Sequence, residues 1–426
     1  MGPRTAALTF ATALALAALP ACSGGADTPA GGTGSGATGG TGGAGGTTGF
    51  VGPDVFDVPI DGVDTALETA FFEGDNLFDL VLHEADGLGP LYTRSACSAC
   101  HDKGVRGPGS VQKMVVVEAD GVTPAADQSK LPYGHTVHPL LAAGAQTPIV
   151  PPDDPEVLVT LRVGPPILGR GYLEAIDDAE ILARATEQED RPDAIHGRPN
   201  HVVYASEPNP DPTFNAHKKG DMVLGRFGTK ARIGTLDEFT ADALQGDMGI
   251  TSPLRPMEFP NPDGLGDDLK QGVDVTADSV NKRAMYVRLT AIPRRDGLDA
   301  SGEALFEQVK CGVCHAPTMK TREDYPLALL AGLDAPVFTD MLLHDMGVEL
   351  ADGMIDGEAG SRDWRTAPLI GLRFNKTFLH DGRAHTIEEA ILAHGGEGSE
   401  AAESTALYKS LGPADHDALL AYVSAL

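Results

Sequence analysis

The sequence predicts a mainly α-helical protein of two domains, with long Gly/Pro-rich loops and few short strands. Apolar residues recur at helical spacing wherever a periodicity is visible, whereas alternating strand patterns are confined to short stretches such as Val115–Glu118 and Val157–Val163. The 52 glycines and 31 prolines of the chain separate these patterns. A chain of 426 residues is long enough for two domains, which we place at residues 51–290 and 291–426.

The chain is strongly acidic. It has 61 Asp and Glu residues against 32 Lys and Arg, a formal net charge of −29. Such a charge repels phosphate backbones and anionic lipid headgroups, so we expect no nucleic-acid partner. The same charge would suit a basic partner protein.

The first 22 residues have the pattern of an export signal. Arg4 precedes an apolar stretch, Ala6–Leu19, that is too short to span a bilayer. The following Leu19-Pro20-Ala21-Cys22 resembles a bacterial lipobox, which predicts lipidation at Cys22. An ordinary signal peptide is the alternative. With Ser23 after the cysteine, we expect an outer-membrane lipoprotein on the periplasmic side that meets the membrane only through its lipid.

Residues 23–50 predict a flexible tether. They are almost entirely Gly, Thr, Ala and Ser, and such a segment cannot bury enough apolar surface to offset its ordering entropy. It would hold a folded body on the order of 30 Å from the anchor.

Two C-x-x-C-H motifs carry the chemistry of the chain: Cys97, Cys100 and His101, and Cys311, Cys314 and His315. Two thiols at this spacing reach the two vinyl groups of one porphyrin edge, and the adjacent His ligates the iron. A thioredoxin-like thiol pair would not require His in both copies, and a zinc site would leave both His residues idle. We therefore predict two covalently bound c-type haems, each in a class I cytochrome c-like domain, the first domain with insertions.

A helix pair is predicted around the second motif. Asp299 is a plausible N-cap, and Gly302 and Phe306 lie four residues apart on one helix face that leads into Cys311. The apolar stretch from Pro413 to Leu426 is the candidate helix that crosses this face, as in class I cytochromes c.

His394 is the predicted sixth ligand of the second haem. Thr386 and Glu389 form a capping box, so a helix begins at Thr386. On that helix His394 falls on the apolar face in the last turn, before Gly395-Gly396. The alternative is a His that only caps the helix C-terminus.

The first half of the chain carries a partial echo of this region. Residues 162–167 resemble residues 365–370, and residues 177–182 resemble the capped segment 386–391. In this alignment the counterpart of His394 is Ala185. The first iron therefore has either an open position or another ligand, for which His135 and His138 are the candidates.

Several stretches from Gly87 to the C-terminus resemble the di-haem oxidoreductase family of peroxidases, relatives of the bacterial di-haem cytochrome c peroxidases. The resemblance rests on the following residues: 87–90, 225–228, 246–250, 343–347, 364–369, 378–384 and 394–397. The family places the sixth ligand of the second haem 14 residues beyond the His of a His-Asp-Gly sequence. From His380 this spacing leads to His394.

The resemblance implies a direction of electron flow. Electrons from a redox partner protein, such as a small cytochrome, would enter at the His315/His394 haem and reach hydrogen peroxide or another oxidant at the His101 haem. An acid would assist there. Glu174 lies in the corresponding region, although a solvated loop carboxylate is the alternative interpretation. Trp364, the only tryptophan, is a candidate hole carrier or simply a core residue.

Two main functions follow. The first is a peroxidase-like oxidoreductase with one oxidant-binding haem and one relay haem. The second is a non-catalytic electron-transfer cytochrome in which both irons have six ligands. Ala185 favours the enzyme, and His135 and His138 favour the carrier. Oxidative modification of a partner protein is a third function.

Overall fold

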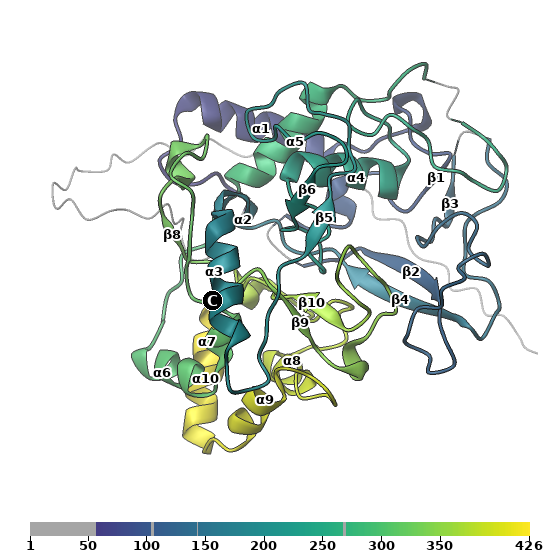
Figure 1. The fold of residues 1–426 in the computed structure, drawn as a ribbon. Coiled ribbons are helices and arrows are strands. Elements are labelled where there is room, and N and C mark those ends of the chain that lie inside the picture. The colour runs from purple at the N-terminus through teal and green to yellow at the C-terminus, as the bar shows by residue number, and fades with distance from the viewer. Residues whose placement is uncertain (1–56, 104–105, 143, 267–269) are drawn as a thin grey trace, which may run out of the picture. The chain divides into compact units, whose positions relative to one another are not determined.

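Figure 1 shows helices spread through the described part of the chain, joined by long loops, with short paired strands among them. This computed structural model describes residues 57–103, 106–142, 144–266 and 270–426. The predicted signal segment, Cys22 and the tether lie outside the described residues. No helix in the described part of the chain is long and apolar enough to cross a membrane.

The described residues contain ten α-helices. Their bounds are α1 Thr65–Asp79, α2 Arg170–Ala175, α3 Asp178–Glu189, α4 Leu236–Met248, α5 Ala277–Leu289, α6 Ala300–Gln308, α7 Cys311–Cys314, α8 Ile387–Ala393, α9 Ala402–Lys409 and α10 Pro413–Ala425. An Asp or Thr directly precedes each of the helices α1, α3, α4, α5, α6 and α8. Its side chain accepts hydrogen bonds from the backbone N–H groups of the first turn.

The strands form five separate two-stranded antiparallel sheets within the described ranges. The pairs are β1 Leu91–Tyr92 with β3 Leu140–Leu141, β2 Ser110–Val116 with β4 Val157–Val163, β5 His201–Val203 with β6 Met222–Leu224, β7 Met319–Lys320 with β8 Asp334–Ala335, and β9 Leu343–Asp345 with β10 Asp363–Arg365. Ser110 lies opposite Val163, so the end of β4 is fixed beside the loop after the first motif.

The predicted fold class is wrong. Of the described residues 32% are helical and 15% are in strands, and no class I cytochrome c domain is found. Frequent glycine and proline shorten the helices and strands. In the long loops, backbone N–H groups donate to the carbonyl oxygens of other loop residues. All described residues fall within one unit of contacts. The domain boundary near residue 290 stays a prediction.

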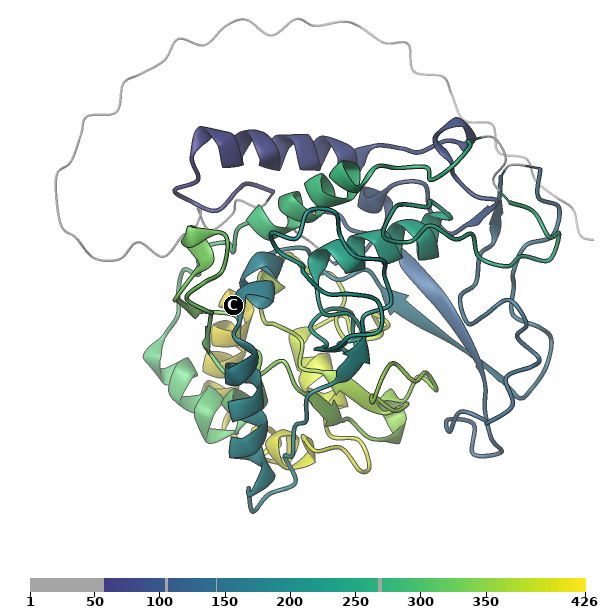
Figure 2. The ribbon, with the colours of Figure 1, turned by 45° about the horizontal axis from the view of Figure 1, so that its top comes forward.

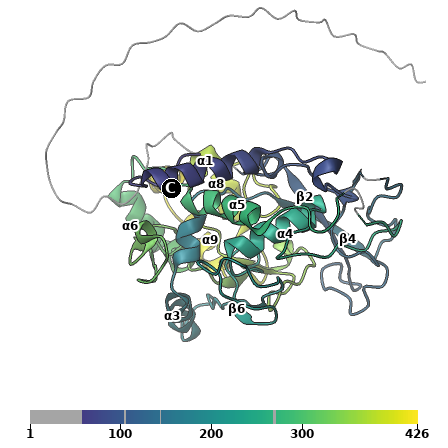
Figure 3. The ribbon, with the colours of Figure 1, turned by 90° about the horizontal axis from the view of Figure 1, so that it is seen from above.

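Helices α1, α4 and α5 support the first motif. Figures 2 and 3 show α1 running beside α5. Gly74 permits this approach, because a Cβ there would lie 2.2 Å from the Lys282 carbonyl oxygen. Phe71 and Phe78 of α1 pack on Tyr286 of α5, with ring centroids 5.0 and 5.1 Å apart. These contacts fix the end of α1 over the loop that carries the cysteines.

Helices α6 and α10 support the second motif, and their predicted pairing is confirmed. A Cβ on Gly302 would lie 2.4 Å from the Tyr422 Cβ, so only glycine allows α10 to pass this closely. The Phe306 and Tyr422 rings lie 5.6 Å apart in an apolar cluster with Leu419 and Val423. The pairing fixes the end of α6, three residues before Cys311.

Candidate functional site

The first motif forms a tight turn, a 3-10 helix at Cys97–Ala99. Nδ1 of His101 donates a hydrogen bond to the Pro165 carbonyl oxygen at 2.8 Å, because a carbonyl only accepts. This bond leaves Nε2 unprotonated and available for a metal. Burial lowers the pKa of His101, which keeps the imidazole neutral.

The second motif is built in the same way on helix α7. Nδ1 of His315 donates to the Phe338 carbonyl oxygen at 3.2 Å, so Nε2 is again available. Burial, together with the charge of His394, lowers the pKa of His315 to about 4. His394 lines the same cavity as His315, and it is the predicted sixth ligand.

His394 follows the last turn of α8. Its Nδ1 donates to the Ala390 carbonyl oxygen at 2.6 Å, so the residue does cap its own helix. The cap uses one ring nitrogen only. Nε2 remains available at the cavity that also contains His315. The capping interpretation and the ligand prediction are therefore compatible, and ligation itself stays a prediction.

Both motifs line one cavity of about 390 Å³. Its walls are mostly apolar and include Phe306, Ile391 and Leu419. The four motif cysteines form no disulfide among the described residues, so all four thiols are available. Paired thiols, neutral imidazoles and apolar walls in a shared cavity fit two haem groups.

A second cavity of about 440 Å³ lies beside the first motif and is lined by both candidate ligands of the first iron. Nδ1 of His135 donates to the Met114 carbonyl oxygen at 3.0 Å, which leaves Nε2 available, as in His101. His138 is different, because its Nε2 donates to the Gly246 carbonyl oxygen at 2.6 Å and its Nδ1 is buried without a partner. Of the two, His135 has the geometry of a ligand.

Glu174 is neither a loop carboxylate nor a residue of the cavity wall. It is buried in α2 and accepts hydrogen bonds from Arg288 Nε at 2.6 Å, Tyr325 Oη at 2.7 Å and Leu236 N at 2.7 Å. Burial opposes its ionisation, but Arg288 outweighs burial and lowers the pKa of Glu174. Its oxygens are occupied in holding α2, α4 and α5 together, so the structure does not support a catalytic role.

Asp247 is the carboxyl group that sequence reasoning missed. Phe239, Ala243 and Asp247 lie at four-residue spacing on one face of α4, and this face lines both cavities. The Asp247 carboxylate has no hydrogen-bond or ion-pair partner in the described ranges. Burial raises its pKa, although Lys113 opposes the shift. Spacing within α4 alone predicts the shared face, but not which cavity it lines.

Trp364 is a buried residue of the cavity wall. Its ring stacks on His380 at 3.9 Å, the Lys230 ammonium lies 4.0 Å from its centroid, and its Nε1 donates to the Leu350 carbonyl oxygen at 2.9 Å. A positive charge at this distance disfavours an electron hole on the indole. The geometry therefore favours the core interpretation of Trp364.

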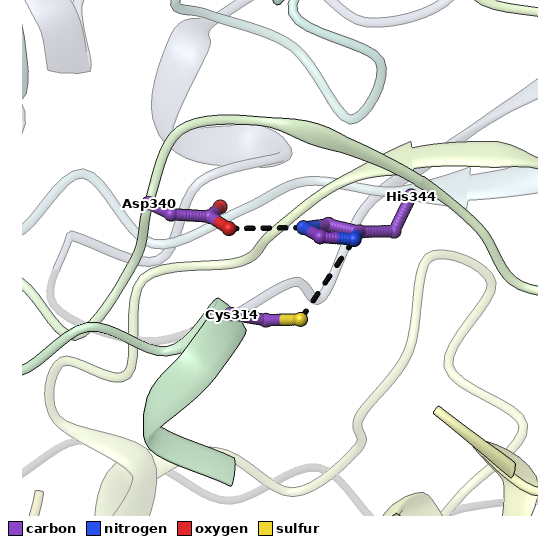
Figure 4. A group of neighbouring side chains, drawn as sticks. All are labelled: Cys314, Asp340 and His344. Carbon is purple, nitrogen blue, oxygen red and sulfur yellow. Dashed lines mark hydrogen bonds and ion pairs between the residues drawn. The ribbon is translucent and has the colours of Figure 1, made fainter. Parts of the chain in front are cut away.

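Cys314, Asp340 and His344 form a cluster in which the potential metal-binding atoms lie within 4.8 Å of one another (Figure 4). His344 is held on both sides: Nε2 lies 2.9 Å from Asp340 Oδ2, and Nδ1 lies 2.7 Å from Glu400 Oε2. Burial opposes the imidazolium, but Cys314 and Asp340 outweigh it and raise the pKa of His344 well above its usual value. A protonated imidazole has no free lone pair, so the cluster as arranged does not bind a metal ion.

The similarity between the two halves of the chain predicts the wrong residues around the first haem. Helix α3 does begin at capping Asp177, but Gln188 in its last turn donates to the Val313 carbonyl and to Asp340, beside the second motif. Ala185 packs against the main core instead. The alignment of Ala185 with His394 is therefore a wrong guide to the first iron.

A family model described as "Di-haem oxidoreductase, putative peroxidase" matches residues 152–426. The chain belongs to this family. Membership supports haem as the cofactor and oxidoreductase as the class. The matched range of this di-haem oxidoreductase contains the second motif, His394 and Asp247, whereas the first motif precedes it.

No curated protein matches the chain. Among solved structures the chain is similar to hydrazine synthase of Kuenenia stuttgartiensis, pressurised with xenon, at 12% identity and a TM-score of 0.36. The match covers 92% of this chain and 100% of that chain. At this TM-score the similarity establishes neither a shared fold nor a shared activity.

Proposed function

We propose that the protein is an exported di-haem c-type cytochrome oxidoreductase with peroxidase-like activity. The observation that carries the proposal is the shared cavity, where two C-x-x-C-H motifs each present a His whose Nδ1 is bonded to a backbone carbonyl. The haems supply electron storage and, at an iron with an open position, oxidant binding. Cys97, Cys100, Cys311 and Cys314 attach them covalently.

The two sites have different tasks in this proposal. His315 and His394, beside α7 and α8, would hold the second iron and make that haem an electron relay. Two His ligands favour a lower potential than a His/Met pair. His101 would hold the first iron, and the adjacent second cavity would give hydrogen peroxide or another oxidant room to approach.

Asp247 supplies the proton that an oxidant needs when its O–O bond breaks. Its carboxylate has no hydrogen-bond or ion-pair partner among the described residues, and it borders both cavities. Burial raises its pKa, so its acid form persists to higher pH than that of an ordinary aspartate. Lys113, near Asp247, lines the second cavity and is the neighbour best placed to influence the return of the proton.

A non-catalytic electron carrier is the second candidate function, and His135 favours it. Its Nε2 is available in the cavity that borders His101. If His135 binds the first iron, both irons have six ligands and the oxidant has no open position. The carrier and the peroxidase therefore differ in whether His135 is bound to the first iron.

Export and anchoring belong to the same proposal. Covalent haem attachment in bacteria occurs outside the cytoplasm, which agrees with the export pattern in residues 1–22 and with a lipid on Cys22. The electron donor would be a small redox protein, for which the net charge of −29 favours a basic docking surface.

The optical and EPR spectra of the purified protein, recorded with and without peroxide, test the proposal. We expect two covalently bound haems, one low-spin and one whose spectrum changes with peroxide, in the oxidised or the half-reduced protein. Two low-spin haems that ignore peroxide in both states would establish the carrier instead. A wild-type protein without covalently bound haem would refute both functions.

A further inference from the structure

Basic residues gather on the wall of the shared cavity although the chain as a whole is acidic. Among the described residues, the wall contains a single carboxylate, Asp247, and these six basic residues: Arg94, Arg106, Arg170, Arg283, Lys310 and Arg365. Lys310 is paired with Asp193 and Glu403. The five arginines therefore set the charge of the cavity.

None of these five arginines has a carboxylate partner within the described residues, whereas 12 other arginines there do. Arg170 donates to the Pro166 carbonyl oxygen, at 2.9 Å from Nε and 2.6 Å from Nη2, and its Nη1 is buried without a partner. Arg365 donates to the carbonyls of Gly228 and Thr366. Arg106 donates to the Leu379 carbonyl, and its Nε is buried without a partner.

The positive charge of the five arginines is therefore not compensated by a carboxylate of the described residues. A buried cation without a counter-charge costs several kcal/mol of folding free energy. Burial accordingly lowers the pKa of Arg170 to about 9, helped by nearby Arg365, and that of Arg365 to about 10. Carbonyl oxygens satisfy part of the hydrogen-bonding capacity of a guanidinium but none of its charge.

Haem propionates are the carboxylates that this cavity would receive. The thiols fix one edge of each haem, so the propionates extend from the opposite edge. Arg94 and Arg283 act electrostatically on Cys100 and Cys97 and so lie near the thiol edge. Arg106, Arg170 and Arg365 are the remaining candidates.

Arg170 and Arg365 both line the cavity and are connected to different motifs. Arg170 follows Pro165, whose carbonyl holds His101. Thr366, next to Arg365, is bonded to Thr339 and Leu342, in the segment after the Phe338 that holds His315. Both guanidiniums line the one cavity that the two motifs share. The positive charge of Arg365 also lowers the pKa of Arg170.

We propose that Arg170 and Arg365 together bind propionates of both haems and form a shared electrostatic contact between the two sites. This inference rests on the haem attachment of the proposed function, but not on peroxidase activity. Bidentate guanidinium–carboxylate pairs suit the role. A substitution at either arginine would then change the reduction potentials of both haems.

The test compares Arg170→Gln and Arg365→Gln with Arg295→Gln. Arg295 is a matched control, because it is half-buried like Arg170 and Arg365 and lies outside the cavity wall. It donates to the carbonyls of Pro336 and Leu369 and to an oxygen of the terminal Leu426. Each haem's reduction potential is measured by spectroelectrochemistry on the full-length protein with both haems attached. We expect either cavity substitution to lower both potentials, since lost positive charge favours ferric iron, and the control to change neither.

Conservative variants keep the test decisive if the Gln variants do not accumulate. Arg170→Lys and Arg365→Lys should shift the propionate bending bands of both haems in resonance Raman spectra, whereas Arg295→Lys should not. A shift in only one haem for each substitution would overturn the shared contact. Unchanged bands and potentials would overturn propionate binding altogether. A wild-type chain without bound haem would instead refute the proposed function.

Discussion

The two attachment sites share one geometry but have different surroundings. His101 and His315 each donate Nδ1 to a backbone carbonyl. The second site lies among apolar helices, and His394 lines the same cavity wall as His315. The first site borders an additional cavity with charged walls, where His135 and Asp247 lie. The motif defines how a haem is held, and the surroundings determine what its iron does.

Removing the proposed second ligand should have the largest effect on this comparison. We expect His394→Ala to convert the second haem from low-spin to high-spin, because the substitution removes its proposed sixth ligand. His135→Ala should leave the first haem unchanged. EPR spectra of both variants measure this, and a spin change in His135→Ala would make the sites equivalent and favour the carrier.

Breaking the polar frame of the first site comes next. Glu174→Gln leaves Arg288 buried with only one carboxylate, Asp237, so we expect a loss of about 3–5 kcal/mol in the free energy of unfolding. Chemical denaturation measures it. Glu180→Gln removes a partly exposed pair with Arg184 and should cost less than about 1 kcal/mol. Equal effects in the two variants would contradict a structural role for Glu174.

Asp247→Asn tests the chemical difference between the sites. We expect the rate of the peroxide reaction to fall roughly 100-fold, the size of a lost general acid, with the second haem's potential unchanged. The wild-type rate should fall as pH rises through the raised pKa of Asp247, because the acid form is lost there, and the variant should lack this dependence. A variant with the wild-type pH profile would exclude Asp247 as the acid.

The apolar frame of the second site should give the smallest effect. Gly302→Ala forces α6 away from Tyr422 and should cost about 1–3 kcal/mol of stability. Gly246→Ala is the control, because a Cβ there meets nothing within 4 Å and helix propensity favours alanine. Thermal unfolding measures both, and an unchanged midpoint in Gly302→Ala would mean that the helices do not pack closely.

The sequence alone determined the local features. The C-x-x-C-H motifs, the capped helix that ends at His394 and the Gly302 face depend on spacings of a few residues, which the backbone geometry of turns and helices reproduces directly. The loops between these features were not predictable in this way. Their paths depend on distant partners, and the class I cytochrome c prediction failed there.

Only the tertiary structure decided which side chains meet across the chain. It paired Glu174 with Arg288 and placed α3 beside the second motif. Among the described residues it left Asp247 and the five cavity arginines without a partner of opposite charge. No sequence pattern distinguishes a paired arginine from an unpaired one, because its partner lies many residues away. Charge compensation over such separations is set by the path of the folded chain, and the chemistry of this cavity depends on it.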